Sequence, residues 1–143
     1  MADRSVFIDT GFLVALLNRR DALHAQAKAL AARWQAQGHT TVTTEAVLLE
    51  FANFFGKSPL RIACVTAIRR IREAQGWTIE RLTPKLLERG ETRYAAHPDK
   101  SWSLTDCVSM EVMLDHGLRD AATPDHHFEQ AGFRVLMPTE SHS

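Results

Sequence analysis

The sequence predicts an α/β fold in which a short, mainly parallel sheet has helices on both faces. Short runs rich in β-branched and apolar residues alternate with longer, helix-favouring segments along the whole chain. The segments between these runs are long enough to contain helical crossovers, which parallel strands require. A chain of 143 residues can also bury one sizeable core. We therefore expect residues 1–143 to form a single domain.

Five short strands are expected. They fall at residues 5–8, 40–43, 77–82, 120–123 and 133–136. The first reads Ser-Val-Phe-Ile and runs directly into Asp9, and the second is rich in threonine. The third begins at Trp77, and only a short helix separates the fourth from the fifth. In parallel sheets ligands bind beyond the carboxyl ends of the strands, so the residues that follow these strands are candidates for function.

Seven helices are expected around these strands. They cover residues 11–20, 21–38, 45–56, 59–76, 83–96, 104–117 and 126–132. Asp21 is expected to cap the second helix, which ends at Gly38. Pro59 and Gly76 bracket the fourth helix in the usual order of proline at the start and glycine at the end.

The composition is that of an ordinary globular protein. Hydrophobic residues make up 45% and charged residues 24% of the chain, which argues against disorder. No apolar stretch approaches the roughly 20 residues that cross a bilayer, and the N-terminus lacks a signal-peptide layout, so we expect a cytoplasmic protein without membrane contact. Cys64 and Cys107 lie in apolar helical contexts and are expected to be buried and reduced. A formal net charge of zero gives no argument for nucleic-acid binding.

Asp9 and Glu50 are acidic residues in apolar surroundings. Asp9 lies between an apolar strand and an apolar helix, so it enters a buried turn, and it is equally explained as the N-cap of that helix. Glu50 lies in a helix that is apolar nearly all round. A carboxylate there must pair with an arginine, reach water or bind a cation.

Asp106 and Asp125 also have two explanations each. Ser103 and Asp106 have the spacing of a capping box at the head of a helix, and Asp125 can be the N-cap of a short helix. Both also lie next to predicted strand ends, so a capping role and a role at the sheet edge are compatible. Asp99 and Glu111 are expected to be exposed.

Together the four carboxylates predict a cation site. Two unit charges 4 Å apart repel by about 4 kcal/mol at an effective dielectric constant of ~20, so such a cluster must take up protons or bind a cation. Mg²⁺ and Mn²⁺ prefer carboxylate and water oxygens and suit sites that phosphate groups complete. The adjacent His126 and His127 do not favour zinc, because neighbouring residues on a helix cannot easily face one ion.

Four segments resemble a known family. They read FIDTGFLVALLNRRDALHAQA, TTEAVLLEF, WSLTDCVSMEVMLDHGLRDAATPDHHF and QAGFRVL. In order, spacing and flanking residues they resemble PIN-domain proteins, in particular the VapC-type ribonuclease toxins of bacterial toxin–antitoxin pairs. The resemblance covers almost the whole chain. It implies a three-layer α/β/α fold and an endoribonuclease site that depends on Mg²⁺ or Mn²⁺.

The resemblance also implies roles for the four acids. By motif position, Asp9 and Asp106 would be the main metal ligands, and Glu50 and Asp125 would complete the acidic cluster. Either Glu50 or Asp125 would orient or deprotonate the attacking water. A PIN-like module that binds RNA or protein without turnover is the alternative function, and the intact set of four acids disfavours it.

Other residues and partners follow from the same resemblance. Thr10 and Thr123 match small polar residues beside the cluster and would orient a water or a phosphate. From their position rather than from the resemblance, Arg19 and Arg20, just after the first helix and close to the predicted sheet edge, are candidates for contacts to RNA phosphates. The expected partners are an RNA substrate, a cognate antitoxin whose segment fills the acidic groove, and a second copy in a homodimer.

Overall fold

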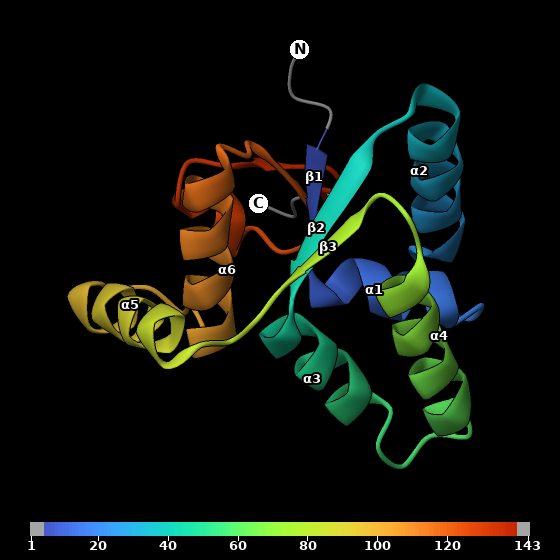
Figure 1. The fold of residues 1–143 in the computed structure, drawn as a ribbon, viewed down its shortest axis with the longest axis horizontal. Helices are drawn as coiled ribbons and strands as arrows, with labels where there is room; N and C mark the ends of the chain where they lie inside the picture. The colour runs from blue at the N-terminus through green and yellow to red at the C-terminus, as the bar shows by residue number, and fades with distance from the viewer. Residues whose placement is uncertain (1–4, 140–143) are drawn as a thin grey trace.

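The structure is a computed structural model that describes residues 5–139, and a five-stranded sheet lies at its centre (Figure 1). All neighbouring strands are parallel, in the order β3-β2-β1-β4-β5. The strands are β1 (Ser5–Ile8), β2 (Thr40–Thr44), β3 (Trp77–Glu80), β4 (Asp120–Ala122) and β5 (Arg134–Val135). The predicted parallel sheet is therefore confirmed, with the first strand in its middle.

Helices cover both faces of the sheet. They are α1 (Thr10–Leu17), α2 (His24–Gln37), α3 (Glu45–Phe54), α4 (Arg61–Glu73), α5 (Pro84–Ala96), α6 (Leu104–His116) and α7 (His127–Gln130). In Figure 1, α5 and α6 lie on one side of the strands and α2 and α4 on the other. This is the three-layer α/β/α arrangement that the sequence predicted. None of the described helices is both long enough and apolar enough to cross a membrane.

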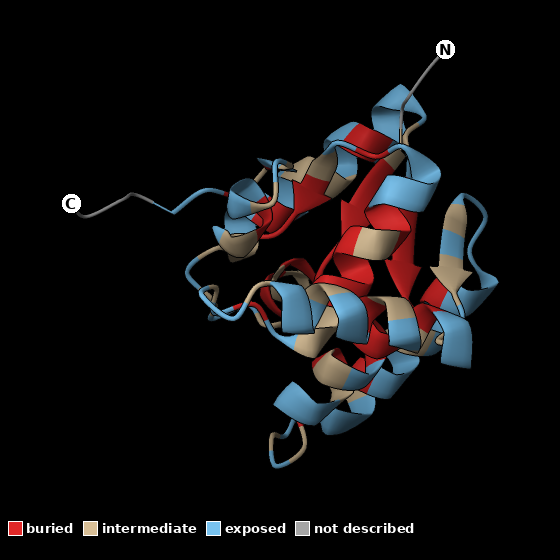
Figure 2. Cartoon of the chain, turned by 90° about the vertical axis from the view of Figure 1, so that its left-hand side faces the viewer, coloured by how far each residue is buried: buried red, intermediate tan, exposed pale blue. Residues whose placement is uncertain are grey.

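The central strand is buried on both faces, as its continuous apolar sequence requires. Val6, Phe7 and Ile8 are each 2% exposed or less. The ring of Phe7 lies 6.4 Å from that of Phe128, which α7 contributes. Figure 2 shows the buried residues gathered on the strands and the inner helix faces, with exposed residues on the outer turns.

The register of the sheet brings distant segments to one edge. Ile8 pairs with Ala122, and the backbone N–H of Asp9 donates to the Ala122 carbonyl over 3.2 Å. From the other neighbouring strand, the buried Thr43 hydroxyl donates to the Ile8 carbonyl over 2.8 Å. Asp9 and Thr123 therefore emerge side by side from the carboxyl ends of adjacent strands.

The second helix begins later than the sequence predicted. α2 starts at His24, so Asp21 is not its cap. Instead, the Asp21 carboxylate accepts a hydrogen bond from the backbone N–H of Leu23 over 2.9 Å, which forms a turn before the helix. The predicted end is correct, because Gly38 has the left-handed conformation with φ of 71° that favours glycine.

Both cysteines, Cys64 and Cys107, are buried and free of disulfides, as expected.

Glu111 is not exposed, contrary to expectation. Its carboxylate accepts hydrogen bonds from Arg89 and Arg93 of the neighbouring α5, at 3.0 and 2.6 Å. Arg89 also forms a bidentate pair with Asp115 and holds the pKa of that carboxyl below its usual value. These ion pairs join α5 to α6. The prediction for Asp99 holds, since its side chain is 71% exposed.

Gly90 sets how closely α5 approaches α6. A Cβ atom at this position would lie 2.6 Å from Cγ2 of Val108, a buried and stiff β-branched residue of α6.

We predict that Gly90→Ala lowers the free energy of unfolding by about 1–3 kcal/mol, measured by urea denaturation, despite the better helix propensity of alanine. In a double-mutant cycle, Val108→Ala should remove most of this cost. Unchanged or increased stability of Gly90→Ala would contradict this packing.

Candidate functional site

A pocket of about 770 Å³ opens at the carboxyl edge of the sheet. The residues that line it are Asp9, Thr10, Gly11, Glu50, Asn53, Phe54, Ser101, Ser103, Asp106, Thr123, Pro124, Asp125 and His127. All four predicted acids are among them. The β1–α1 junction, α3, the start of α6 and the segment after β4 each contribute one acid.

Asp9 is held at the bottom of this pocket. It is 4% exposed, and its Oδ2 accepts a hydrogen bond from the Thr123 hydroxyl over 2.8 Å. Asp9 occupies the N-cap position of α1, but its side chain makes no capping hydrogen bond. Its Oδ1 atom is buried without a hydrogen-bond partner. The capping explanation therefore does not account for this carboxylate.

Gly11 allows the loop after β4 to approach α1. A Cβ atom at Gly11 would lie 2.6 Å from Cδ of Pro124. The Thr123 hydroxyl then accepts the backbone N–H of Asp125 over 3.0 Å, while it donates to Asp9. One hydroxyl thus fixes the positions of two acids.

Asp106 combines its two predicted roles. Ser103 and Asp106 form a complete capping box, with both hydrogen bonds at 3.0 Å. The same carboxylate lies at the pocket, where oxygens of Asp9, Asp106 and Asp125 lie within 4.8 Å of one another. These three aspartates, which we call the aspartate cluster, are close enough for one divalent ion to contact them all.

Glu50 lies in the same pocket but outside this cluster. Its Oε1 accepts a hydrogen bond from the Thr10 hydroxyl over 2.5 Å. Within residues 5–139 no basic side chain forms an ion pair with it, so the arginine-paired alternative does not apply. The structure thus separates the predicted set into three clustered aspartates and one glutamate at the side.

Burial and like charge make the aspartate cluster unfavourable when fully ionised. Burial raises the pKa of Asp9 to about 7, and the negative charge of Asp106 adds to this shift, whereas the Thr123 hydrogen bond opposes it. Burial also raises the pKa of Asp106. Near neutral pH the cluster must therefore hold a proton or a cation.

His127 is a pocket residue that the sequence analysis considered only as half of a zinc pair and did not include in the site. Its Nδ1 lies 3.1 Å from oxygens of both Asp106 and Asp125, so it bridges two members of the cluster. The signal in the sequence that could have identified His127 as a site residue was its position two residues after Asp125. The argument against paired histidines was wrong in its geometry, because nitrogens of His126 and His127 and an oxygen of Asp125 also lie within 4.8 Å of one another.

Arg19 and Arg20 are not brought to this pocket. They follow the C-terminal end of α1, whereas Thr10 at the start of α1 lines the pocket. An eight-residue helix is about 12 Å long, and this length separates the two arginines from the cluster. Both side chains are exposed.

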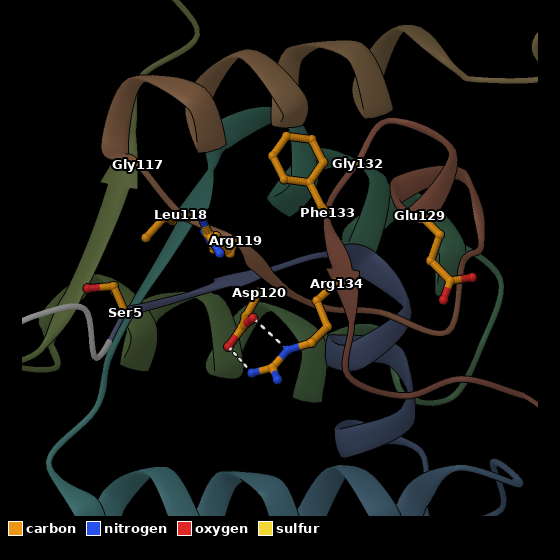
Figure 3. Close-up of a pocket in the computed structure, with 9 residues that line it drawn as sticks. All are labelled: Ser5, Gly117, Leu118, Arg119, Asp120, Glu129, Gly132, Phe133 and Arg134. Carbon is orange, nitrogen blue, oxygen red and sulfur yellow. Dashed lines mark hydrogen bonds and ion pairs between the residues drawn. The ribbon is translucent and has the colours of Figure 1, made fainter.

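A second cavity, of about 980 Å³, lies at the opposite ends of the strands (Figure 3). Its charged residues are balanced in sign, with Arg119 and Arg134 against Asp120 and Glu129. Arg134 and Asp120 satisfy each other in a bidentate pair at 2.9 and 2.8 Å, which Figure 3 shows. Asp9 and Glu50, which have no basic partner among the described residues, lie at the opposite end of the sheet from this cavity, at the carboxyl edge of the strands. We therefore place the candidate site in the pocket at that edge.

Fold and site together define an α/β domain with a carboxylate-rich pocket at the carboxyl edge of a parallel sheet. Residues 6–134 match the PIN domain. Over 133 residues the chain is 31% identical to the 23S rRNA-specific endonuclease VapC20 of Mycobacterium tuberculosis, a match that covers 93% of this chain and 98% of that protein. The chain belongs to the PIN-domain family, in its VapC-type branch, and the resemblance seen in the sequence is confirmed.

Solved structures show the same relationship. The crystal structure of M. tuberculosis VapC20, described as a sarcin–ricin loop cleaving toxin, matches with a TM-score of 0.79 at 30% identity and covers 90% of this chain and 95% of that one. VapBC2 from Rickettsia felis, bound to promoter DNA, has a TM-score of 0.64 at 12% identity over 92% and 96% of the two chains. FitAcB from Neisseria gonorrhoeae has a TM-score of 0.64 at 14% identity over 91% and 95%. These last two show that the fold is shared.

The raised pKa of Asp9 predicts how the stability of the metal-free protein depends on pH. The folded protein holds a proton on Asp9 up to a pKa of about 7, whereas the unfolded chain releases it near the ordinary aspartate pKa of 3.8. Stability therefore falls as pH rises between these values. In EDTA, we expect the Tm to fall by about 5 °C between pH 5 and pH 8 because of this group.

Asp9→Asn should remove most of this fall and raise the Tm at pH 8. Asp21→Asn is the matched control, because its amide oxygen still accepts the Leu23 N–H and it lies outside the pocket. If wild type and Asp9→Asn lose stability in parallel from pH 5 to pH 8, Asp9 is not the group responsible.

Proposed function

We propose that this protein is a divalent-metal-dependent endoribonuclease, the toxin of a toxin–antitoxin pair. The observation that carries the proposal is the aspartate cluster, with the orphaned Asp9 Oδ1 at its base. A buried, unpaired carboxylate oxygen is costly unless a ligand binds to it. The near full-length relationship to VapC20, an RNA endonuclease by name, supports the same activity.

The residues present fit Mg²⁺ or Mn²⁺. Asp9, Asp106 and Asp125 offer oxygens of the kind that hard cations prefer, and their mutual repulsion falls when a cation binds. Together with Glu50, they are the residues that we propose hold the ion. A bound divalent ion supplies charge that stabilises the phosphoryl transition state and makes water a stronger acid.

The chain's own residues would then orient the reactants. Thr123 fixes one oxygen of Asp9, and the other has no hydrogen-bond partner and is free to bind the ion. His127 sets the spacing of Asp106 and Asp125. Glu50 is the better candidate for accepting the proton of the attacking water, because it lines the pocket without belonging to the aspartate cluster.

The remaining roles are also part of this proposal. Thr10 and Thr123 are proposed to orient a water or a phosphate, and Arg19 and Arg20 to contact RNA further from the scissile bond. We propose ribosomal RNA as the substrate class, because VapC20 is specific for 23S rRNA and is described as cleaving the sarcin–ricin loop. A ribonuclease acts where its RNA is, which points to the cytoplasm.

Family membership further supports a cognate antitoxin and a homodimer as partners. Residues 1–143 are proposed to form one PIN domain, of which residues 6–134 match the family.

Cleavage of an RNA oligonucleotide that contains the sarcin–ricin loop tests the activity. We expect Mn²⁺ or Mg²⁺ to support cleavage and EDTA to abolish it. Asp9→Asn and Asp106→Asn should each lower the rate by more than about 100-fold, because each removes a proposed ligand, while Asp21→Asn keeps the wild-type rate. Binding of the RNA without metal-dependent cleavage would favour the alternative of a binding module, and cleavage that survives both substitutions would indicate a contaminant.

Metal binding can be measured without RNA. At pH 8 and 100 times its Kd, Mn²⁺ should stabilise the wild-type protein by about 2.7 kcal/mol, seen as an increase in Tm. Asp106→Asn should shift the midpoint of this Mn²⁺ titration at least about tenfold higher. The Asp21→Asn variant should titrate like the wild type. A Tm that does not respond to Mn²⁺ or Mg²⁺ would argue against the proposed ion site.

A further inference from the structure

Phe54 is an exposed aromatic residue at the edge of the acidic pocket. Its exposure is 62%, although phenylalanine usually gains free energy from burial. It is the last residue of α3, one helical turn after Glu50, and both residues line the pocket. The Cα atoms of Phe54 and Glu50 are therefore about 6 Å apart along the helix axis, and the two side chains lie on the same face of the helix.

The ring of Phe54 is held in place by buried aromatic residues. It makes an edge contact with the ring of Phe55, with centroids 5.0 Å apart and planes at 75°. Phe55 is 2% exposed and makes a similar contact with Phe51, at 5.7 Å and 87°. This arrangement orients the exposed ring before any ligand binds.

The pocket has no strong electrostatic attraction of its own for RNA. Of the described residues that line it, none is a lysine or an arginine, and four are acidic. A polyanion that enters must therefore depend on the bound cation and on contacts that do not use charge. An aromatic face is such a contact, because every nucleobase can stack on it.

We propose that Phe54 is the stacking platform for an unpaired base of the RNA substrate, next to the phosphate that is cleaved. The inference rests on the proposed nuclease function and names the recognition that the function requires. Single-stranded loops are recognised by stacking splayed bases on aromatic side chains. The neighbouring Asn53 is exposed, lines the same pocket and offers an amide to the edge of the stacked base.

The occupant is a base rather than a protein side chain because of where the ring lies. Leu49 and Ile62 are also exposed, at 60% and 73%, but neither lines the acidic pocket. Ser101 and Ser103, which line the same pocket, offer hydroxyl groups suited to phosphate or ribose. The ring of Phe54 thus borders the acid-lined pocket, whereas Leu49 and Ile62 do not.

The test compares Phe54→Ala with Phe54→Trp. Affinity is measured for a sarcin–ricin loop RNA with phosphorothioate linkages in the loop, in Ca²⁺, and KM and kcat are measured on the natural RNA in Mn²⁺. Phe54→Ala should weaken binding and raise KM by about 5- to 150-fold, with a smaller change in kcat. Phe54→Trp should retain affinity, and the fluorescence of the new tryptophan should be quenched by the RNA.

Leu49→Ala is the matched control, because Leu49 is on the same helix and equally exposed but lies outside the pocket. It should leave binding and cleavage unchanged. Size-exclusion chromatography and thermal melting check the fold and the oligomeric state of each variant.

The two proposals can fail separately. If the wild-type protein does not cleave RNA, the nuclease proposal fails. If it does, and Phe54→Ala keeps the wild-type affinity and KM, the stacking inference is wrong. A change of oligomeric state in Phe54→Ala would also overturn it, because the ring would then belong to an interface between copies.

Discussion

The mutual repulsion of three clustered carboxylates, two of them buried, is the constraint around which the rest of the molecule is arranged. Asp9 has one oxygen without a partner, and Asp106 and Asp125 lie close to it. A sequence selected for stability alone would place apolar or paired side chains there. The surrounding fold offsets the cost, because the strand that carries Asp9 is buried on both faces. The burial that makes the acids costly also removes competing water, which strengthens their attraction for a cation.

Several residues serve the fold and the pocket at once. Asp106 closes a capping box and contributes an oxygen to the aspartate cluster. The Thr123 hydroxyl accepts a hydrogen bond from the backbone N–H of Asp125 and donates one to the carboxylate of Asp9. For this reason, a structural explanation of an acid in the sequence does not exclude a functional one. The chain instead places its functional groups where local structure already requires a polar side chain, which limits the loss of stability.

The features that the sequence predicted correctly depend either on residues close together in the chain or on the order of the strands. The helix end at Gly38 and the helix start at Thr83 depend on neighbouring residues. Asp9 and Asp125 were found because they follow strands, Glu50 because its helix is apolar, and Asp106 from its capping-box spacing. The later start of α2 was missed, because Asp21 can equally form a turn. The pairing of Glu111 and the bridge made by His127 depend on contacts between separate elements. The packing of whole helices against one another sets the distances in these contacts, and a short sequence pattern does not predict that packing.

The hydrogen bond between Thr123 and Asp9 joins residues 114 positions apart. β1 lies in the middle of the sheet, yet one of its two neighbours, β4, is synthesised long after it. At a synthesis rate of about 5–20 residues per second, the delay is on the order of 10 s. Throughout this time a nascent chain has Asp9 without the strand that completes its surroundings. A chain that is released before β4 is made therefore carries no assembled acidic pocket.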